Sequence, residues 1–282
     1  MNTINEIIKS IDLLKPISPA ALQIIEIARC EDVELSEITD TISQDPAMAA
    51  NILKLVNSAF FGLKTKIDTL KSAVTVLGTQ QIAEMALIYG ISGFYANKKS
   101  KGYSLGSGGL WESAVISSEI AKNIAHHLKH PDVERIFTAA LIRDIGKVVL
   151  DQFVTEKVTQ IHKMVSEQQF GYIEAEKAVL GIDHAELGAI LLRKWSVPES
   201  IAKIIEHHHH QSITMVNDSE TAIVQAADAI CSMMGIGTGS DGMSYRLSQD
   251  VAANLIPEDQ VEQLIGKILI SKSNILSRFL GD

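Results

Sequence analysis

Residues 140–150 read ALIRDIGKVVL and set a charged pair, Arg143 and Asp144, inside a run of apolar side chains. In a helix, Asp144 would lie on the same face as Ala140 and Leu141, which precede it by four and three positions. A carboxylate on a buried face costs free energy unless a cation or a metal ion pairs with it. The stretch therefore predicts a helix that carries a polar site into the core of a helical protein.

The sequence around this stretch repeats the signals of helix starts and ends. The dipeptides Ser-Pro at 18–19 and Asp-Pro at 45–46 each suit a capping residue followed by the first residue of a helix. Gly78 is expected to end one helix. Asp132 is expected to cap a single helix that contains Ala140, Asp144 and Val148.

Helix signals continue on the C-terminal side. Asp183 and Glu186 have the spacing of a capping box, and Pro198 suits the first position of a helix that ends in four histidines. A further helix is expected to end near Gly235, before a glycine-rich loop at 236–246 that we expect to be mobile. Because alternating strand patterns are scarce, the predicted fold class is all-α.

A change in composition predicts the domain boundary. Residues 97–109, NKKSKGYSLGSGG, are rich in Gly, Ser and Lys, which is typical of a linker. We therefore expect an N-terminal helical subdomain at 1–96 and a second helical subdomain with a C-terminal extension at 110–282.

Composition narrows the classes of function. Hydrophobic residues make up 46 % of the 282 residues, and no run approaches the roughly 20 apolar residues of a membrane span. The N-terminus lacks the apolar segment of a signal peptide, so we expect a cytoplasmic protein without membrane association. Cys30 and Cys231 are then expected to be free, buried thiols. The net charge of −9 argues against nucleic-acid binding, and the lysines at 98–101 read as solvated linker.

Other ionisable residues interrupt the apolar helices farther along the chain. His184 begins one predicted helix, four histidines at 207–210 end another, and Asp228 lies within the apolar run TAIVQAADAI. Taken singly, such residues commonly cap a helix, pair with arginine or face solvent. Taken together with Asp144, they suit a divalent metal ion. The candidate ligands are Asp144, His184, His207, His208 and Asp228.

The first 78 residues carry motifs that resemble the HDOD family. The most specific are Asp-Pro at 45–46, LVNSAFFG at 55–62 and the pattern I-x-x-L-x-x-A-V-x-x-L-G at 67–78. The later segments LWESAV, ALIRDIGKVVL, VLGIDHAELGAILLRKWSVP, IIEHH and AADA resemble the second half of that family, a relic of the HD phosphohydrolase superfamily. The resemblance implies a helical bundle followed by an HD-like helical core. It also implies a bacterial signalling module that usually lacks the full metal site.

The match to the HD metal site is incomplete at two positions. The resemblance places Ser113 where the superfamily has its first histidine ligand, and Arg143 where it has the histidine of the His-Asp pair. Loss of two ligands out of four should strongly weaken metal binding, and the fixed positive charge of Arg143 opposes a divalent ion.

The remaining positions of that site carry residues that match. The two aspartates and the downstream histidines are present, together with a lysine that stands where HD-GYP enzymes carry the lysine of their HDIGK motif. These residues are Asp144, Asp228, His184, His207 or His208, and Lys147.

We therefore expect a non-catalytic signalling or scaffolding module that binds another signalling protein and needs no cofactor. Its partner, its oligomeric state and the roles of the 236–246 loop and the C-terminal extension stay open. In one alternative, a shifted site holds iron, manganese, magnesium or zinc and hydrolyses a phosphate ester. Its ligands would be Asp144, His184, His208 and Asp228. In another, Arg143 and Lys147 share a helix edge and bind a phosphate or nucleotide without catalysis.

Two expectations concern geometry. The Arg143 guanidinium should do the structural work of the missing metal by pairing with an acidic side chain of the second subdomain. In the histidine run, helical phase places His207 and His208 near the buried face, whereas His209 and His210 should point toward solvent.

Overall fold

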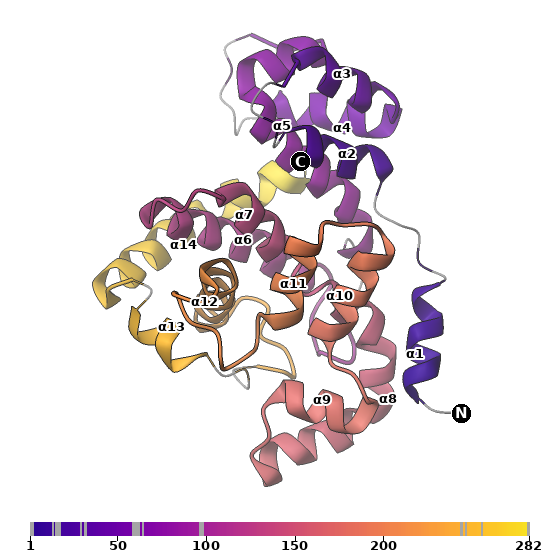
Figure 1. Ribbon diagram of the computed structural model, residues 1–282, viewed down its shortest axis with the longest axis vertical. Helices are drawn as coiled ribbons and strands as arrows, with labels where there is room; N and C mark the ends of the chain where they lie inside the picture. The colour runs from indigo at the N-terminus through magenta and orange to yellow at the C-terminus, as the bar shows by residue number, and fades with distance from the viewer. Residues whose placement is uncertain are drawn as a thin grey trace. The chain divides into compact units, whose positions relative to one another are not determined.

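The computed structural model is built from helices (Figure 1). It describes residues 3–12, 14, 18–28, 30, 33–57, 63, 65–95, 99–242, 245, 247–254 and 256–280. Within these ranges the one extended pairing is an isolated bridge between Ser100 and Leu105. The predicted all-α class is confirmed. None of the described helices is long and apolar enough to cross a membrane.

The chain divides into two compact units, which do not follow one break in the sequence. The larger unit joins Met1–Lys15 to Phe94–Ile270, and the smaller joins Pro16–Gly93 to Ser271–Asp282. The expected subdomains at 1–96 and 110–282 differ from this division, since the first 15 residues group with the second half of the chain. The last residues of the C-terminal extension group with the first half.

The smaller unit contains α2 (Pro19–Ile27), α3 (Leu35–Ser43), α4 (Pro46–Val56) and most of α5 (Leu70–Tyr95). Asp45 caps α4 as predicted, because its carboxylate accepts the Met48 amide at 3.0 Å. Ser18 makes no capping bond and donates its hydroxyl to Asp45 instead, at 3.1 Å. Gly78 interrupts α5 with a φ of +81°.

In this part of the chain one prediction is wrong and others fall on residues that are not described. Cys30 is exposed, against expectation, whereas Cys231 is buried, and both thiols are free. Residues 58–62, the end of the LVNSAFFG motif, lie outside the described residues, as do residue 96 and the first two residues of the expected linker, 97 and 98.

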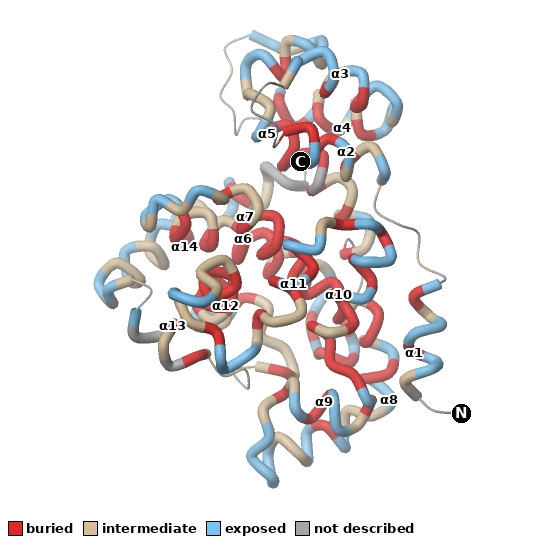
Figure 2. The backbone as a smooth tube through the Cα atoms, in the orientation of Figure 1, coloured by how far each residue is buried: buried red, intermediate tan, exposed pale blue. Residues whose placement is uncertain are grey.

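The larger unit contains α1 and most of the remaining helices. Their bounds are α1 Thr3–Ile11, α6 Gly109–His127, α7 Val133–Ile142, α8 Ile145–Gln168, α9 Tyr172–Leu180, α10 His184–Lys194, α11 Glu199–His207, α12 Ser219–Met233, α13 Gln249–Asn254 and most of α14 Glu258–Leu280. α6 packs on α7 and α12, while α10 packs on α8 and α11. Figure 2 shows the buried backbone concentrated in these central helices.

The helix expected to run from Asp132 to Val148 is in fact two helices. α7 ends at Ile142 and α8 begins at Ile145, so Arg143 and Asp144 form the joint between them. Successive side chains on one helix point about 100° apart, which would leave one of this pair facing outward. At the joint both are buried, 1 % and 4 % exposed.

Other local predictions hold in part. Asp183 caps α10 by accepting the Glu186 amide at 2.8 Å, but the Glu186 carboxylate pairs with Lys177 rather than closing a capping box. Asp132 precedes α7 without a capping bond. Pro198 lies one residue before the predicted position and precedes α11.

The described part of the expected linker is fixed to α8. The Asp151 carboxylate accepts the Ser100 hydroxyl at 2.5 Å and the Gly102 amide at 2.8 Å. Tyr103 is fully buried beside these contacts. The segment therefore forms a wall of the larger unit, although Lys99 and Lys101 are exposed as expected.

Candidate functional site

Arg143 lies at the centre of a buried cluster that the joint between α7 and α8 creates. Its Nη2 lies 2.7 Å from Asp228 Oδ1 and 3.1 Å from Asp144 Oδ2, and its Nε donates to Asp228 Oδ1 at 2.9 Å. The same Nη2 donates to the Ser113 hydroxyl at 2.8 Å. The guanidinium therefore links both aspartates and the serine, which agrees with the expected pairing of Arg143 with an acid.

Lys147, one turn along α8, is the second buried cation of the site. Its Nζ lies 2.9 Å from Asp144 Oδ1 and 2.8 Å from Asp241 Oδ2. It also faces the rings of Tyr103 and Tyr245, with 5.5 and 4.8 Å to their centroids. Asp144 Oδ1 makes no hydrogen bond of good geometry among the described residues, so its contact with Lys147 is chiefly electrostatic.

His184, the first residue of α10, is oriented by a buried carboxylate. Glu176 on α9 accepts from His184 Nδ1 at 2.8 Å and from the His184 backbone amide at 3.0 Å. The Tyr103 hydroxyl donates to the other carboxylate oxygen at 2.6 Å. His184 Nε2 therefore faces the site, 3.5 Å from Asp144 Oδ1 and 3.2 Å from His209 Nε2.

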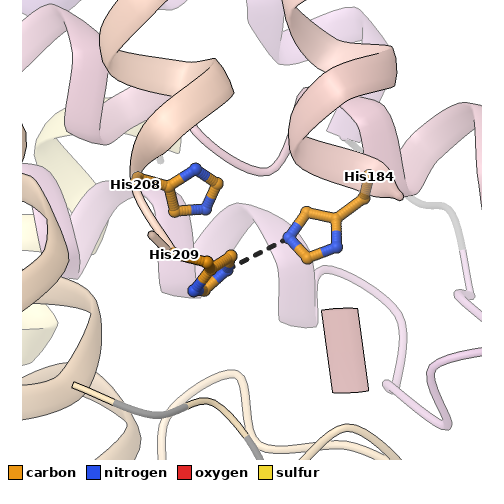
Figure 3. A group of neighbouring side chains, drawn as sticks. All are labelled: His184, His208 and His209. Atoms are coloured by element: carbon orange, nitrogen blue, oxygen red, sulfur yellow. Dashed lines mark hydrogen bonds between the residues drawn. The ribbon is translucent and has the colours of Figure 1, made fainter. Parts of the chain in front are cut away.

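Two residues after α11 complete a histidine cluster with His184 (Figure 3). His208 donates from Nδ1 to the Ile205 carbonyl at 2.6 Å, and its buried Nε2 has no hydrogen-bond partner among the described residues. Each of His184, His208 and His209 places a ring nitrogen within 4.8 Å of the others.

Burial and neighbouring charges set the protonation of the cluster. Burial would lower the pKa of Arg143, but Asp228 and Asp144 raise it above its ordinary value. Burial would raise the pKa of Asp144, yet Lys147 and Arg143 hold it well below its ordinary value. Arg143 and Asp144 therefore stay charged across the physiological pH range.

The three histidines are not equivalent. Burial and then the charge of His184 lower the pKa of His208 to about 3. Burial and then His208 also lower the pKa of His209 well below its ordinary value. Burial would lower the pKa of His184, but Glu176 raises it above the ordinary value. His184 is thus the ring that gains a proton, while the other two stay neutral.

The structure corrects the predicted phase of the histidine run. His207 lies outside the cluster and contacts His210, with ring centroids 4.7 Å apart and the ring planes tilted by 37°. His209 turns into the site, although we expected it to face solvent, because α11 ends at His207 and the helical phase ends with it. His208 is buried and His210 is exposed, both as predicted.

The loop at 236–246 contributes directly to the site. Its residues 243, 244 and 246 lie outside the described residues. Asp241 is only 1 % exposed and accepts from Lys147, and the Tyr245 ring stacks on His209 with centroids 4.2 Å apart. The expectation that this loop is simply mobile does not describe Asp241 and Tyr245.

Sequence reasoning missed several site residues: Tyr103, Glu176, His209, Asp241 and Tyr245. One of them, Glu176, had a signal, because it follows the fully buried Tyr172 by four positions and so shares its helix face. The loop residues have no periodicity that could have identified them.

Two positions in the site differ in whether their side chains could bind a metal ion. The position between Asp144 and Asp228 does not fit a metal, because the Arg143 guanidinium links both carboxylates there. The three histidines do fit one. His208 and His209 are neutral rings, and His208 Nε2 has no hydrogen-bond partner in the part of the chain that the structure describes. Glu176 orients His184 as carboxylates orient metal-bound histidines.

Solved structures of bacterial proteins share this fold. An HDOD domain protein from Geobacter sulfurreducens superposes with a TM-score of 0.73 at 22 % identity, covering 98 % of this chain and 96 % of that one. A candidate phosphohydrolase from Shewanella amazonensis SB2B gives 0.71 at 20 %, covering 98 % and 97 %. A candidate signal transduction protein from Marinobacter aquaeolei VT8 gives 0.75 at 18 %, covering 95 % and 60 %.

The helical frame and these neighbours place the chain in a class of all-helical proteins with a shared fold. It belongs to the HDOD domain family, whose model matches residues 14–211. A protein of Treponema pallidum (strain Nichols) is 26 % identical over 203 residues, which are 71 % of this chain. The match spans only 39 % of that relative's length.

Two histidines of the run, His208 and His210, should respond differently to mutation. We expect His208→Ala to lower the free energy of unfolding by about 1–3 kcal/mol, because it empties a fully buried position. His210→Ala removes an exposed ring and should change stability by no more than about 0.5 kcal/mol. Denaturant unfolding measures both, and equal losses would contradict the burial pattern.

Proposed function

We propose that this chain is a non-catalytic signalling module that acts by binding another protein, on an HD-like frame whose metal position is filled by an arginine. One observation carries the proposal: Arg143 Nη2 lies within 3.1 Å of carboxylate oxygens of both Asp144 and Asp228. The Marinobacter neighbour, described as a candidate signal transduction protein, supports the signalling role.

A divalent ion between the two aspartates would have to displace a buried guanidinium. That guanidinium is also bonded to Ser113, which stands where the resemblance expects the first histidine ligand. The displaced cation would lie beside the metal and repel it. With no metal there, water has no Lewis acid at this position to lower its pKa and make it a nucleophile.

The purified chain is expected to hydrolyse neither phosphodiester nor phosphomonoester substrates when manganese or iron is added. The measurement is product release against a blank without protein. Turnover that Asp144→Ala abolishes would overturn the proposal, provided that the exposed control Asp12→Ala retains it. Circular dichroism must show that the Asp144→Ala variant is folded.

A second candidate function, metal binding at His184, His208 and His209, is favoured by the unpartnered His208 Nε2. A metal there would bind three neutral imidazoles, and a protonated His184 would lose one proton on binding. Metal analysis of the same preparation tests it. One ion per chain that is lost in His208→Ala and kept in His210→Ala supports this candidate. A preparation that contains no bound ion contradicts it.

The proposed partner is a separate protein or a further domain of a signalling system. Affinity capture from bacterial extract, followed by reconstitution with the purified partner, tests this part of the proposal. A defined complex that forms without turnover of any nucleotide supports the proposal of a non-catalytic module that binds another protein. A chain that hydrolyses phosphate esters and forms no such complex contradicts it.

A further inference from the structure

The buried cluster around Arg143 contains more carboxylates than cations. Its ion pairs join three aspartates to two basic side chains, namely Asp144, Asp228, Asp241, Arg143 and Lys147. Glu176 also borders the cluster, but it faces His184, which supplies at most one positive charge. Because buried charge is costly unless it is compensated, the cluster formed by these described residues is one cation short.

Asp228 is the least compensated of the three aspartates. Asp144 lies against both Arg143 and Lys147. Asp241 accepts hydrogen bonds from four donors, two of them backbone amides. The contacts of Arg143 Nε and Nη2 with Asp228 both fall on Oδ1, at 2.9 and 2.7 Å, and no residue in the described part of the chain donates to Oδ2. This oxygen is therefore the place where a further cation is best accommodated.

A cavity of about 190 Å³ lies against α12 beside this carboxylate. Asp228, otherwise buried and only 8 % exposed, is part of its lining. Ser232 lines the cavity one turn farther along α12, and its hydroxyl has no hydrogen-bond partner among the described residues. Ala229, Met233 and Leu247 form an apolar wall. The cavity therefore has hydrogen-bond acceptors on one side and apolar side chains on another.

The lining favours a small organic cation over a metal ion. A divalent ion takes several charged or imidazole ligands, whereas this cavity offers one free carboxylate oxygen and one hydroxyl. His209 also lines it, but its Nε2 is bonded to His184. An ammonium group carries one positive charge and three N–H donors, and an attached alkyl chain suits the apolar wall. The volume is below the roughly 300 Å³ of sites for drug-sized ligands, so the ligand is small.

We propose that this cavity is a binding site for a primary alkylammonium ion. Its charged end donates to Asp228 Oδ2 and to the Ser232 hydroxyl, while its alkyl chain packs against Ala229, Met233 and Leu247. The ligand thereby supplies the positive charge that the buried cluster lacks. Binding needs no movement of the chain, and it is independent of whether the module's output is a protein partner.

The test is a titration of the full chain with n-butylammonium, followed by amide NMR at constant ionic strength with a chelator present to remove metal ions. We expect saturable shifts of the Ala229 and Ser232 amides. n-Butanol, which has the same chain without the charge, should bind at least about tenfold more weakly, because charge-assisted hydrogen bonds are the stronger ones. Ammonium without the chain should also bind at least about tenfold more weakly, since it buries no apolar surface. Equal affinity of n-butylammonium and either other probe, or no saturable binding of n-butylammonium, overturns the proposal.

A variant that fills the cavity tests the location of the site. Ala229→Leu places a larger side chain in the cavity from a partly exposed position on α12, so the core stays as it is. It should weaken n-butylammonium binding at least about tenfold, because the added side chain clashes with the ligand. Ala49→Leu, at a partly exposed position on α4 of the smaller unit, should bind as wild type does. Unchanged affinity in Ala229→Leu overturns the proposal.

Asp228→Asn separates recognition of charge from a general effect on the fold. It removes the charge and keeps the shape, so n-butylammonium should bind no more than about twofold more tightly than n-butanol. The ratio of the two affinities is the readout, because a loosened cavity would weaken both probes alike. A ratio that stays at about tenfold overturns the proposal.

A further variant covers the case in which Asp228→Asn does not fold because Arg143 loses its partner. Ser232→Ala removes one acceptor from a partly exposed position. It should weaken n-butylammonium binding at least about threefold, since the ammonium group loses a hydrogen bond. Wild-type affinity in Ser232→Ala overturns the proposal.

Discussion

Replacing Arg143 with alanine should lower the free energy of unfolding by about 3–5 kcal/mol, as expected when one partner of a buried ion pair is removed. The side chain is 1 % exposed and holds Asp228, Asp144 and the Ser113 hydroxyl. Without it, Asp228 loses its cation, whereas Asp144 keeps its contact with Lys147. Denaturant unfolding monitored by circular dichroism measures the loss.

The matched control is Arg193→Ala. Arg193 also pairs with two acids, Glu199 and Glu206, but its side chain is 35 % exposed. Exposed ion pairs contribute about 1 kcal/mol or less, so this variant should lose far less stability. A loss at Arg143 no larger than at Arg193 would contradict the view that the guanidinium replaces a metal.

A double variant separates the ion pair from the space it fills. Arg143→Met/Asp228→Leu removes both charges and keeps much of the volume. It should recover a substantial part of the stability that Arg143→Ala loses, because the uncompensated carboxylate of Asp228 is gone. A double variant as unstable as Arg143→Ala would show that packing, rather than charge pairing, governs the loss.

Gly146→Ala should have an effect of comparable size through backbone packing. A Cβ at Gly146 would lie 1.9 Å from the His184 carbonyl oxygen and 2.8 Å from the Gly188 amide nitrogen. These are backbone atoms of α10 that no side-chain rotation can move, so α8 and α10 would have to separate. We expect a loss of about 3 kcal/mol, at the upper end of overpacking effects.

Gly266→Ala is the matched control for that variant. Gly266 lies within α14, and a Cβ there would meet no atom of the described residues within 4 Å. Alanine is the better helix former, so this change should be neutral or stabilise by up to about 1 kcal/mol. A Gly146→Ala variant as stable as wild type would show that α8 and α10 do not approach so closely.

The sequence was sufficient for the fold class and for the pairing of Arg143, because both follow from local chemistry. Apolar periodicity marks helices, and a buried aspartate beside an arginine needs a partner. The break between α7 and α8 could not be predicted, because the apolar periodicity continues through it. Gly146, just after the break, packs closely against α10, and that contact joins residues far apart in sequence.

The same limit explains the errors at the site. Helical phase predicted His208 correctly but failed at His209, because α11 ends at His207. Asp241 and Tyr245 lie in a loop with no repeating pattern, and their positions depend on Lys147 and His209, which come from other segments. Tertiary contacts, rather than local propensity, bring these residues to the site.

The bond between Arg143 and Ser113 also bears on how such a site can evolve. Because Nη2 donates to the Ser113 hydroxyl, a histidine at 113 alone would have to displace the guanidinium. A Cβ on Gly237 would lie 2.5 Å from the Ser113 side chain, so there is little room for a larger residue. Histidine at 143 alone would remove the cation that both aspartates need. Each single step toward a metal ligand set at these positions therefore costs stability before it provides one, so single mutations do not readily lead from this arrangement to a metal site.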